Sequence, residues 1–310
     1  MAMTQRTLDA AAGTEQSPRR RHDGGARAQL LDGIPVTERR LELAGVSTAL
    51  LVGGDGPPIV LLHGPGESAV NWRWVIPALV ETHRVIAPDL PVHGSTAVPD
   101  GELDAEGVLA WLADLIDRTC GSPPALVGHV LGGAIAARAA IEHGDRLDRL
   151  VLVDTLGLAP FRPSPRFALG LLRFAARPSE RSYDRFMRQC AFDLDGLRER
   201  MGDGWEPFAA YNLELARAPS AKAAGKLLRT VGMPAIPPQQ LARVAVPTSL
   251  IWGRHDRANR LAIAEEASSR YGWPLHVIDD AADDPARDQP EAFLRALRVA
   301  LDTNVTTRQR

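Results

Sequence analysis

The chain of 310 residues has only two cysteines, few aromatic side chains and no long apolar run. Cys120 and Cys190 are too few for a disulfide framework and do not have the spacing of a metal site. No segment approaches the roughly 18 consecutive apolar residues of a membrane-spanning helix, and the N-terminus lacks the apolar core of a signal peptide. We therefore expect a cytoplasmic protein with no metal, no cofactor and no membrane partner.

The chain also lacks an excess of either charge. It has 36 basic and 38 acidic residues, which gives a net charge of −2. Because binding to nucleic acid requires a basic excess, we expect no nucleic-acid partner. Apolar residues make up 45% of the chain, which is enough to bury a sizeable core and excludes wholesale disorder. The length suits one domain, or a core with a modest insertion.

The pattern of the chain changes after a polar N-terminal stretch. Residues 1–29 are glycine-rich and without hydrophobic period, which predicts a disordered tail. Two strand-like runs at 37–43 and 48–53 predict a hairpin. From residue 59 onward, continuous apolar runs alternate with amphipathic segments. This alternation predicts an α/β fold with a mostly parallel sheet and helices on both faces.

The alternation is interrupted at residues 158–243. This segment has helical patterns and turn prolines but no strand-like run, and the alternation resumes at Val246. We interpret it as a helical cap inserted into a core formed by residues 30–157 and 244–310. Such a cap would lie over the carboxyl ends of the strands, where open α/β sheets bind ligands.

Four parts of the sequence, in order, carry the strongest signal. They are LHGPG (62–66), APDLPVHG (87–94), GHVLGG (128–133), and WGRHD (252–256) followed by DDPARDQPEAF (283–293). Together they resemble the α/β-hydrolase superfamily over about residues 37–301. The resemblance implies the α/β-hydrolase fold.

The resemblance also identifies departures at the positions that do the chemistry. Enzymes of this superfamily place a serine on the turn between a strand and a helix, and an acid and a histidine follow it along the chain. The serine position corresponds to Val130, the acid to Asp256 and the histidine to Asp283. Because valine has no lone pair to attack a carbonyl, the resemblance implies a member without the nucleophilic serine and the catalytic histidine.

The oxyanion hole departs from the family pattern as well. Pro65 stands where the family often supplies one of the oxyanion N–H groups, and proline has no N–H. The backbone N–H groups of Gly66 and Leu131 are the remaining candidates.

We expect the carboxyl groups of Asp256 and Asp283 to face each other. Two carboxylates that share a site raise one pKa, which would provide a general acid or base; the alternative is that both point into water. We also expect a set of side chains around the substrate, and for several of them the alternative role is packing in the core. The side chains expected around the substrate are His63, Pro65, Glu67, Trp74, His129, Val130, Trp252 and His255.

The favoured function is a cofactor-independent, non-hydrolytic reaction on a reactive hydrophobic small molecule. Proton transfer, addition, cyclisation or C–C bond formation would need orientation and a positioned acid but no acyl-enzyme. The family analogy suggests natural-product biosynthesis, and so does a composition rich in Arg, Ala and Gly, which is typical of a high-GC genome. We expect a monomer or a homodimer. Two alternatives remain open: an inactive relic that binds a small molecule, and an epoxide or ester hydrolase with a relocated catalytic group.

Overall fold

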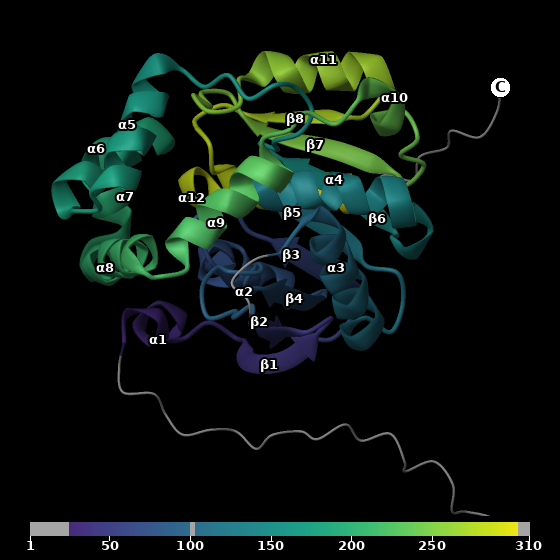
Figure 1. Cartoon of the computed structure of the whole chain (residues 1–310), viewed down its shortest axis with the longest axis horizontal. Helices are drawn as coiled ribbons and strands as arrows, with labels where there is room; N and C mark the ends of the chain where they lie inside the picture. Colours follow the sequence, from purple (N-terminus) through teal and green to yellow (C-terminus); the bar gives the residue numbers. More distant parts are fainter. Residues whose placement is uncertain (1–24, 100–102, 303–310) are drawn as a thin grey trace, which may run out of the picture.

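A single mixed sheet of eight strands forms the centre of the molecule (Figure 1). The computed structural model describes residues 25–99 and 103–302. The strand order is β1-β2-β4-β3-β5-β6-β7-β8; β2 pairs antiparallel with β1 and β4, and every other pair is parallel. The strands are β1 Thr37–Leu43, β2 Val46–Gly53, β3 Pro58–Leu62, β4 Arg84–Pro88, β5 Ala125–His129, β6 Arg149–Val153, β7 Thr248–Gly253 and β8 Leu275–Ile278.

Helices cover both faces of the sheet, as the sequence predicts. Alternate residues of β3 point to opposite sides: Val60 and Leu62 join α3 and α4, whereas Ile59 and Leu61 pack with η1, α2 and α13. This alternation of a fully buried strand explains its continuous apolar run. The helices of the core are α1 Ala26–Leu31, η1 Ala69–Trp74, α2 Ile76–Leu79, α3 Ala105–Thr119, α4 Leu131–His143, η2 Gly144–Arg146, α11 Leu261–Tyr271, α12 Pro285–Asp288 and α13 Pro290–Asp302.

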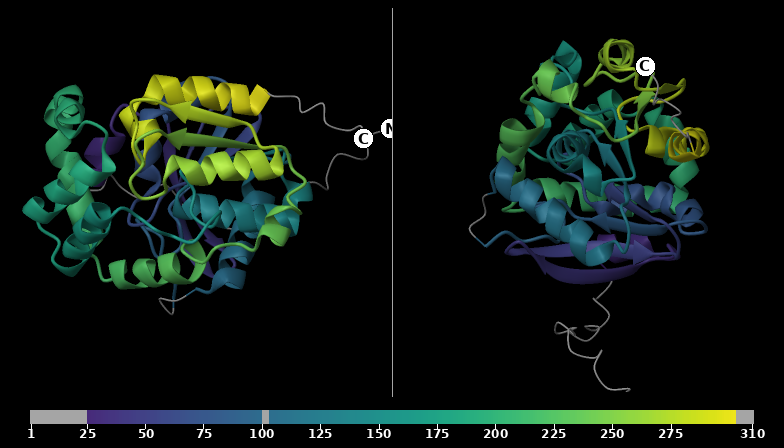
Figure 2. Two further views of the ribbon diagram at one scale, coloured as in Figure 1. Left: turned by 90° about the horizontal axis from the view of Figure 1, so that it is seen from above. Right: turned by 90° about the vertical axis from the view of Figure 1, so that its right-hand side faces the viewer.

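The predicted helical insertion lies between β6 and β7. Within it the regular elements of the described residues are all helices. Most of these helices stand at the side toward which the parallel strands point, whereas the last one lies near the start of β7 (Figures 1 and 2). The cap is therefore confirmed as part of an α/β fold. Its helices are α5 Pro165–Ala176, α6 Glu180–Cys190, α7 Leu194–Met201, η3 Gly202–Gly204, α8 Trp205–Arg217, α9 Ala221–Leu227, the π-helical turn η4 Leu228–Gly232 and α10 Pro238–Leu241.

One local expectation needs correction. The tail predicted for residues 1–29 is shorter, because 26–29 belong to α1; residues 1–24 lie outside the described residues. Arg27 holds α1 in place by donating to the hydroxyl of Tyr211 at 2.7 Å and pairing with the buried Asp89 at 3.2 Å. The notable departure from regular α-helix on this side of the sheet is η1, a 3₁₀ segment that leads into the short helix α2.

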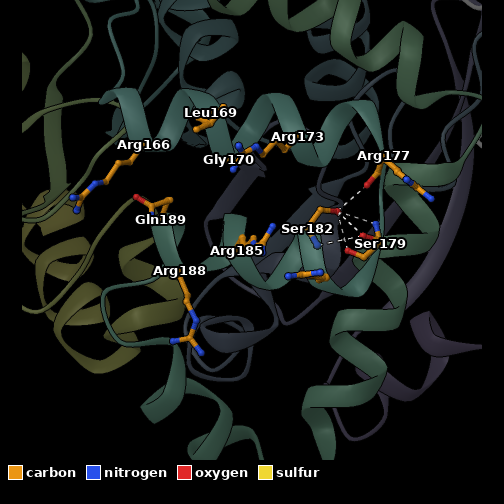
Figure 3. Close-up of a pocket in the computed structure, with 11 residues that line it drawn as sticks. Arg166, Leu169, Gly170, Arg173, Arg177, Ser179, Ser182, Arg185, Arg188 and Gln189 are labelled. Atoms are coloured by element: carbon orange, nitrogen blue, oxygen red, sulfur yellow. Dashed lines mark hydrogen bonds between the residues drawn. The ribbon is translucent and has the colours of Figure 1, made fainter.

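Two surface cavities lie on the cap. One, of about 720 Å³, is lined by residues of α5 and α6 (Figure 3). The other, of about 500 Å³, adjoins it between the start of α5 and Arg257. Neither cavity borders the turn between β5 and α4.

Candidate functional site

The turn between β5 and α4 has a strained backbone. Val130 has φ of +46°, a region that β-branched residues rarely adopt. Its N–H donates to the carbonyl of Val153 at 3.0 Å, and its own carbonyl accepts from Leu156 at 3.2 Å. The neighbouring elements therefore hold residue 130 in this conformation.

Glycines make the sharp turn sterically feasible. A Cβ at Gly128 would lie 2.4 Å from the carbonyl oxygen of Gly132, and a Cβ at Gly132 would lie 2.3 Å from that of Leu62. At Gly133 a Cβ would meet Oγ1 of Thr155 at 2.2 Å. Only glycine fits this close approach of β5, β3 and α4.

The side chain of Val130 lies in a small apolar cluster. It is 9% exposed and packs with Ala134 and Leu156, which are buried, and with the partly buried Phe161 and Leu228. Phe161 and Leu228 come from the cap insertion, so core and cap meet at the turn.

The N–H group of Leu131, one of the two expected oxyanion donors, is free. The N–H groups of Val130 and Gly132 donate to carbonyls of Val153 and His63, whereas that of Leu131, the first residue of α4, has no acceptor among the described residues. A free N–H at a helix N-terminus favours a negative charge. Gly66 lies beyond the partly buried Pro65, is exposed, and has φ of +71°.

Asp256 is buried and its partner is Asp154, not Asp283. Oδ1 of Asp256 accepts from the N–H of Ala258 at 2.6 Å and of Asn259 at 2.9 Å. Burial raises the pKa of Asp256 to about 7, although those hydrogen bonds and one from Asp154 oppose the rise. Burial therefore favours the protonated form of Asp256 more than in an exposed aspartate.

Asp154 is the site residue that the sequence analysis missed. It follows β6 at φ of +42°, is completely buried, and accepts the N–H of Gly253 on Oδ1 at 3.0 Å. Burial and the adjacent charge of Asp256 raise its pKa well above the usual range. The sequence does show a polar residue directly after a strand. The pairing of Asp154 with Asp256 follows only once β6 and β7 are known to be neighbours in the sheet.

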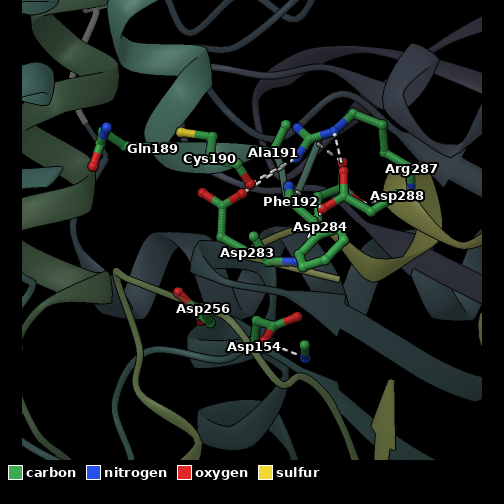
Figure 4. Close-up of polar contacts among 12 residues, drawn as sticks. Asp154, Gln189, Cys190, Ala191, Phe192, Asp256, Asp283, Asp284, Arg287 and Asp288 are labelled. Carbon is green, nitrogen blue, oxygen red and sulfur yellow. Dashed lines mark hydrogen bonds and ion pairs between the residues drawn. The ribbon is translucent and has the colours of Figure 1, made fainter. Parts of the chain in front are cut away.

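Asp283 lies on the loop after β8 and turns toward the cap (Figure 4). Its side chain is 15% exposed, and Oδ1 accepts from Nη2 of Arg287 at 3.4 Å. Burial raises the pKa of Asp283 to about 8; the charge of Arg287 opposes this rise and that of Asp256 adds to it. Asp283 is therefore largely protonated at neutral pH, and it interacts with Asp256 through charge.

Arg287 is a second residue missed from sequence. It is 4% exposed and lies against three carboxyls, with nitrogen–oxygen distances of 3.4 Å to Asp283, 3.5 Å to Asp284 and 3.2 Å to Asp288. Its Nη2 also donates to the carbonyl of Cys190, the last residue of α6, at 3.0 Å. Arg287 thus ties the loop after β8 to the cap.

His129 is held as an imidazolium. Its Nε2 donates to the carbonyl of Asp283 at 2.6 Å, and Nδ1 lies 3.5 Å from Oε2 of Glu67. Burial alone would lower the pKa of His129, but the hydrogen bond and charge of Glu67 dominate and raise it to about 10. Glu67 also accepts the N–H of Gly64 at 2.8 Å. With both nitrogens donating, His129 has no lone pair with which to act as a base.

The remaining pocket candidates divide into structural and exposed residues. His63 is fully buried, accepts from the N–H of Leu90 at 2.9 Å, and has its pKa lowered to about 3 by burial. Trp252 is fully buried and donates to the carbonyl of Asn259 at 2.7 Å, so neither ring reaches a substrate. His255 is exposed, and its ring lies tilted against that of Phe192, with 4.9 Å between the ring centres.

Two buried donors near the site have no acceptor among the described residues. The guanidinium of Arg73, 4.0 Å from the ring centre of Trp74, leaves Nη1 and Nη2 unpaired, and the hydroxyl of Tyr183 is also unpaired. Arg73 and Tyr183 are 8% and 4% exposed, and each shifts the pKa of the other through its charge. Buried polar groups ordinarily have partners.

Within residues 25–99 and 103–302, no helix combines the length and apolar content needed to cross a bilayer. The same residues contain no group of three or more His, Cys, Asp or Glu placed to hold a metal ion.

The sheet order, the strained strand-to-helix turn and the helical insertion after β6 define an α/β-hydrolase-type protein. The alpha/beta hydrolase fold family matches residues 57–283, and the chain belongs to this family. An uncharacterised protein of Mycobacterium bovis is 26% identical over 294 residues, covering 88% of this chain and 83% of that protein.

Relatives with a named activity include one sequence that matches a shorter stretch and two solved structures that match most of the chain. A 2-hydroxy-6-oxo-2,4-heptadienoate hydrolase of Pseudomonas putida is 41% identical over 125 residues, which cover 39% of this chain and 45% of that enzyme. Among solved structures, a meta-cleavage product hydrolase of Pseudomonas fluorescens has a TM-score of 0.71 at 26% identity, covering 85% and 97% of the two chains. A 2-hydroxy-6-oxo-6-phenylhexa-2,4-dienoate hydrolase of a Rhodococcus strain has a TM-score of 0.75 at 24% identity, covering 86% and 99%.

Proposed function

We propose that this protein is an enzyme that acts on a hydrophobic carbonyl compound by proton transfer from Asp283, with no covalent intermediate on residue 130. Asp283 carries the proposal because it is the partly exposed carboxyl at the former triad positions whose pKa of about 8 keeps it protonated at neutral pH. A general acid is most effective when its pKa lies near the working pH. Val130 and the imidazolium of His129 provide no nucleophile and no base.

The proposed step moves one proton. Asp283 donates it to a carbonyl oxygen or an enolate carbon of the substrate, and the carboxylate that remains is stabilised by Arg287 at 3.4 Å. The free N–H of Leu131 would stabilise negative charge on the substrate oxygen. Water returns the proton to Asp283 after the step. Ketonisation, addition, cyclisation and C–C bond formation all require a positioned proton donor. Hydrolysis by a water molecule that attacks the substrate directly requires one as well.

A carboxylate on the substrate would satisfy the unpaired donors of Arg73 and Tyr183. Both groups are buried and lack an acceptor among the described residues, and each acts on the pKa of the other, so one anionic substrate group would supply the acceptor that both lack. The names of the Pseudomonas and Rhodococcus enzymes specify dienoates, which combine a carboxylate, an enol and a ketone. We extend that substrate class to this chain as part of the proposal.

A dienol probe tests the proposal. The absorbance of 2-hydroxy-6-oxo-6-phenylhexa-2,4-dienoate should change in the presence of the protein, and D283N should abolish the change while D279N, at an exposed carboxyl, retains it. R73Q should raise KM more than it lowers kcat. Full activity of D283N would show that another group transfers the proton.

Binding without turnover is the second candidate, and the packing of Val130 favours it. The side chain lies against Phe161 and Leu228 of the insertion, which fills the position that a nucleophile would need. Quenching of tryptophan fluorescence by the same dienol, with no change in its absorbance, would support a binding protein.

A further inference from the structure

The α5–α6 face of the cap is strongly basic. The larger surface cavity, between α5 and α6, is lined by Leu169, Gly170, Ser179, Ser182, Gln189 and by the six arginines Arg166, Arg173, Arg177, Arg181, Arg185 and Arg188 (Figure 3). No carboxylate lines it, although α6 carries Glu180 and Asp184. Arg188 pairs with Asp195 at 3.1 Å; among the described residues the other five have no ion-pair partner.

The same helix exposes apolar side chains beside these arginines. Leu169 is 47% and Leu172 is 66% exposed, and both belong to α5. The opposite side of α5 is anchored by Phe167, which is 5% exposed and stacks edge-on against Phe186 of α6. Exposed leucines therefore lie on the outward side of a helix at the outer edge of the molecule (Figure 1).

We propose that the α5–α6 face docks onto the surface of a bilayer that contains anionic phospholipid. Arginine side chains attract phosphate headgroups, and leucines on the same helix insert among the acyl chains. A soluble anion would account for the arginines but would leave Leu169 and Leu172 in water. We expected no membrane partner because no segment is long and apolar enough to span a bilayer. Peripheral docking needs no spanning helix, so this proposal revises that expectation.

The docked face connects directly to the site. The carbonyl of Cys190 at the end of α6 accepts from Arg287, and it also accepts the N–H of Asp283 at 3.3 Å. The docked face and the loop that carries Asp283 are therefore joined through the end of α6.

Vesicle flotation tests this inference with the full-length protein. Vesicles of phosphatidylcholine containing 30% phosphatidylglycerol (about a third of the lipid, chosen for a strong surface charge) should carry the protein upward, and phosphatidylcholine alone should not. R173E/R177E should weaken binding by at least about fivefold per arginine at low salt. L172D should weaken binding as well, because it places a charge among acyl chains.

Matched variants and competing ligands decide the outcome. R298E and V299D, at exposed positions of α13, should bind as the unchanged protein does, and circular dichroism should show that every variant is folded. Absence of binding to the anionic vesicles would overturn the proposal. Binding that L172D leaves intact, together with equal binding to polyglutamate, would also overturn it and indicate an acidic protein partner.

Discussion

The carboxyl groups of Asp154 and Asp256 share one buried space at the ends of β6 and β7. When both are ionised, neither Oδ2 atom has a hydrogen-bond donor among the described residues. Protonation of Asp154 removes the repulsion and supplies a donor for Asp256. A pair of this kind titrates as a unit, and its retained proton belongs to the site rather than to one residue.

This pair makes stability depend on pH. Both pKa values are raised on folding, so between about pH 4 and 7 the folded chain retains protons that the unfolded chain releases, and stability falls as pH rises. D154N should raise the free energy of unfolding at pH 8 by on the order of 2 kcal/mol and change it little at pH 4. Asparagine also tolerates φ of +42°. Urea denaturation at both pH values, with D279N as control, measures this; destabilisation at pH 8 would contradict it.

The proposed acid predicts the direction of a pH–rate profile. Asp283 must be protonated to act, so kcat for the dienol should be constant at low pH and fall as pH rises through about 8. R287Q should move the fall to higher pH, because the positive charge of Arg287 opposes the rise in the pKa of Asp283. A profile that rises through pH 8 would assign the group a basic role.

The pair of His129 and Glu67 predicts a titration that NMR can follow. The imidazole of His129 should stay protonated until about pH 10, so its contribution to stability is complete below about pH 6.5 and is lost as pH rises through 10. E67Q removes the negative charge of Glu67, so the pKa of His129 should fall, although Asp284 and the carbonyl of Asp283 still raise it. The ¹⁵N shifts of the ring nitrogens report it, with E81Q as an exposed control. An unchanged pKa in E67Q would show that another group holds the proton.

Removing Arg287 should unfold the chain more readily than removing an exposed arginine. R287M leaves the carboxyls of Asp283, Asp284 and Asp288 without their buried cation and should cost about 3–5 kcal/mol at pH 7. Acidic pH should reduce the loss, because the carboxyls become neutral. R254M breaks only the exposed pair with Asp279 and should cost less than about 1 kcal/mol. Equal losses in chemical denaturation would place the cluster among weak surface pairs.

Restoring a serine tests the assignment of the turn. A fluorophosphonate should add no mass to the unchanged protein, and V130S should react little because His129 is protonated and no other imidazole is free to act. V130S combined with D283H should gain labelling, because the new imidazole provides the base that V130S alone lacks. Rapid labelling of V130S alone would reveal a base elsewhere.

The positions of the strands and of the insertion along the chain could be predicted from periodicity. The apolar run of β3 and the interruption after β6 are local patterns, and each fixes an element without reference to distant residues. The short helix α1 was not predicted, because its stability comes from Arg27 contacts to Tyr211 and Asp89 rather than from its own sequence. Tertiary contacts of this kind outweigh weak local propensity.

The chemistry of the site was harder to predict, because it depends on pairs formed between elements. Spacing places Asp256 at the end of a strand, but the choice of Asp154 over Asp283 depends on side-chain direction and on the order of the strands. Likewise, the protonation of His129 depends on Glu67, which comes from the loop after β3. A linear pattern carries no information about these orientations.

The glycine-lined turn at Val130 has an evolutionary consequence. The N–H groups of the turn donate to carbonyls at the ends of β6 and β3, and Gly128, Gly132 and Gly133 leave room for the close approach of the backbone. The side chain of residue 130 therefore contributes little to the position of its own backbone. A substitution at this one position therefore changes the reacting group while the surrounding fold stays intact. Gain and loss of a nucleophile become single-codon events, and new chemistries can be sampled by a lineage without passing through unfolded ancestors.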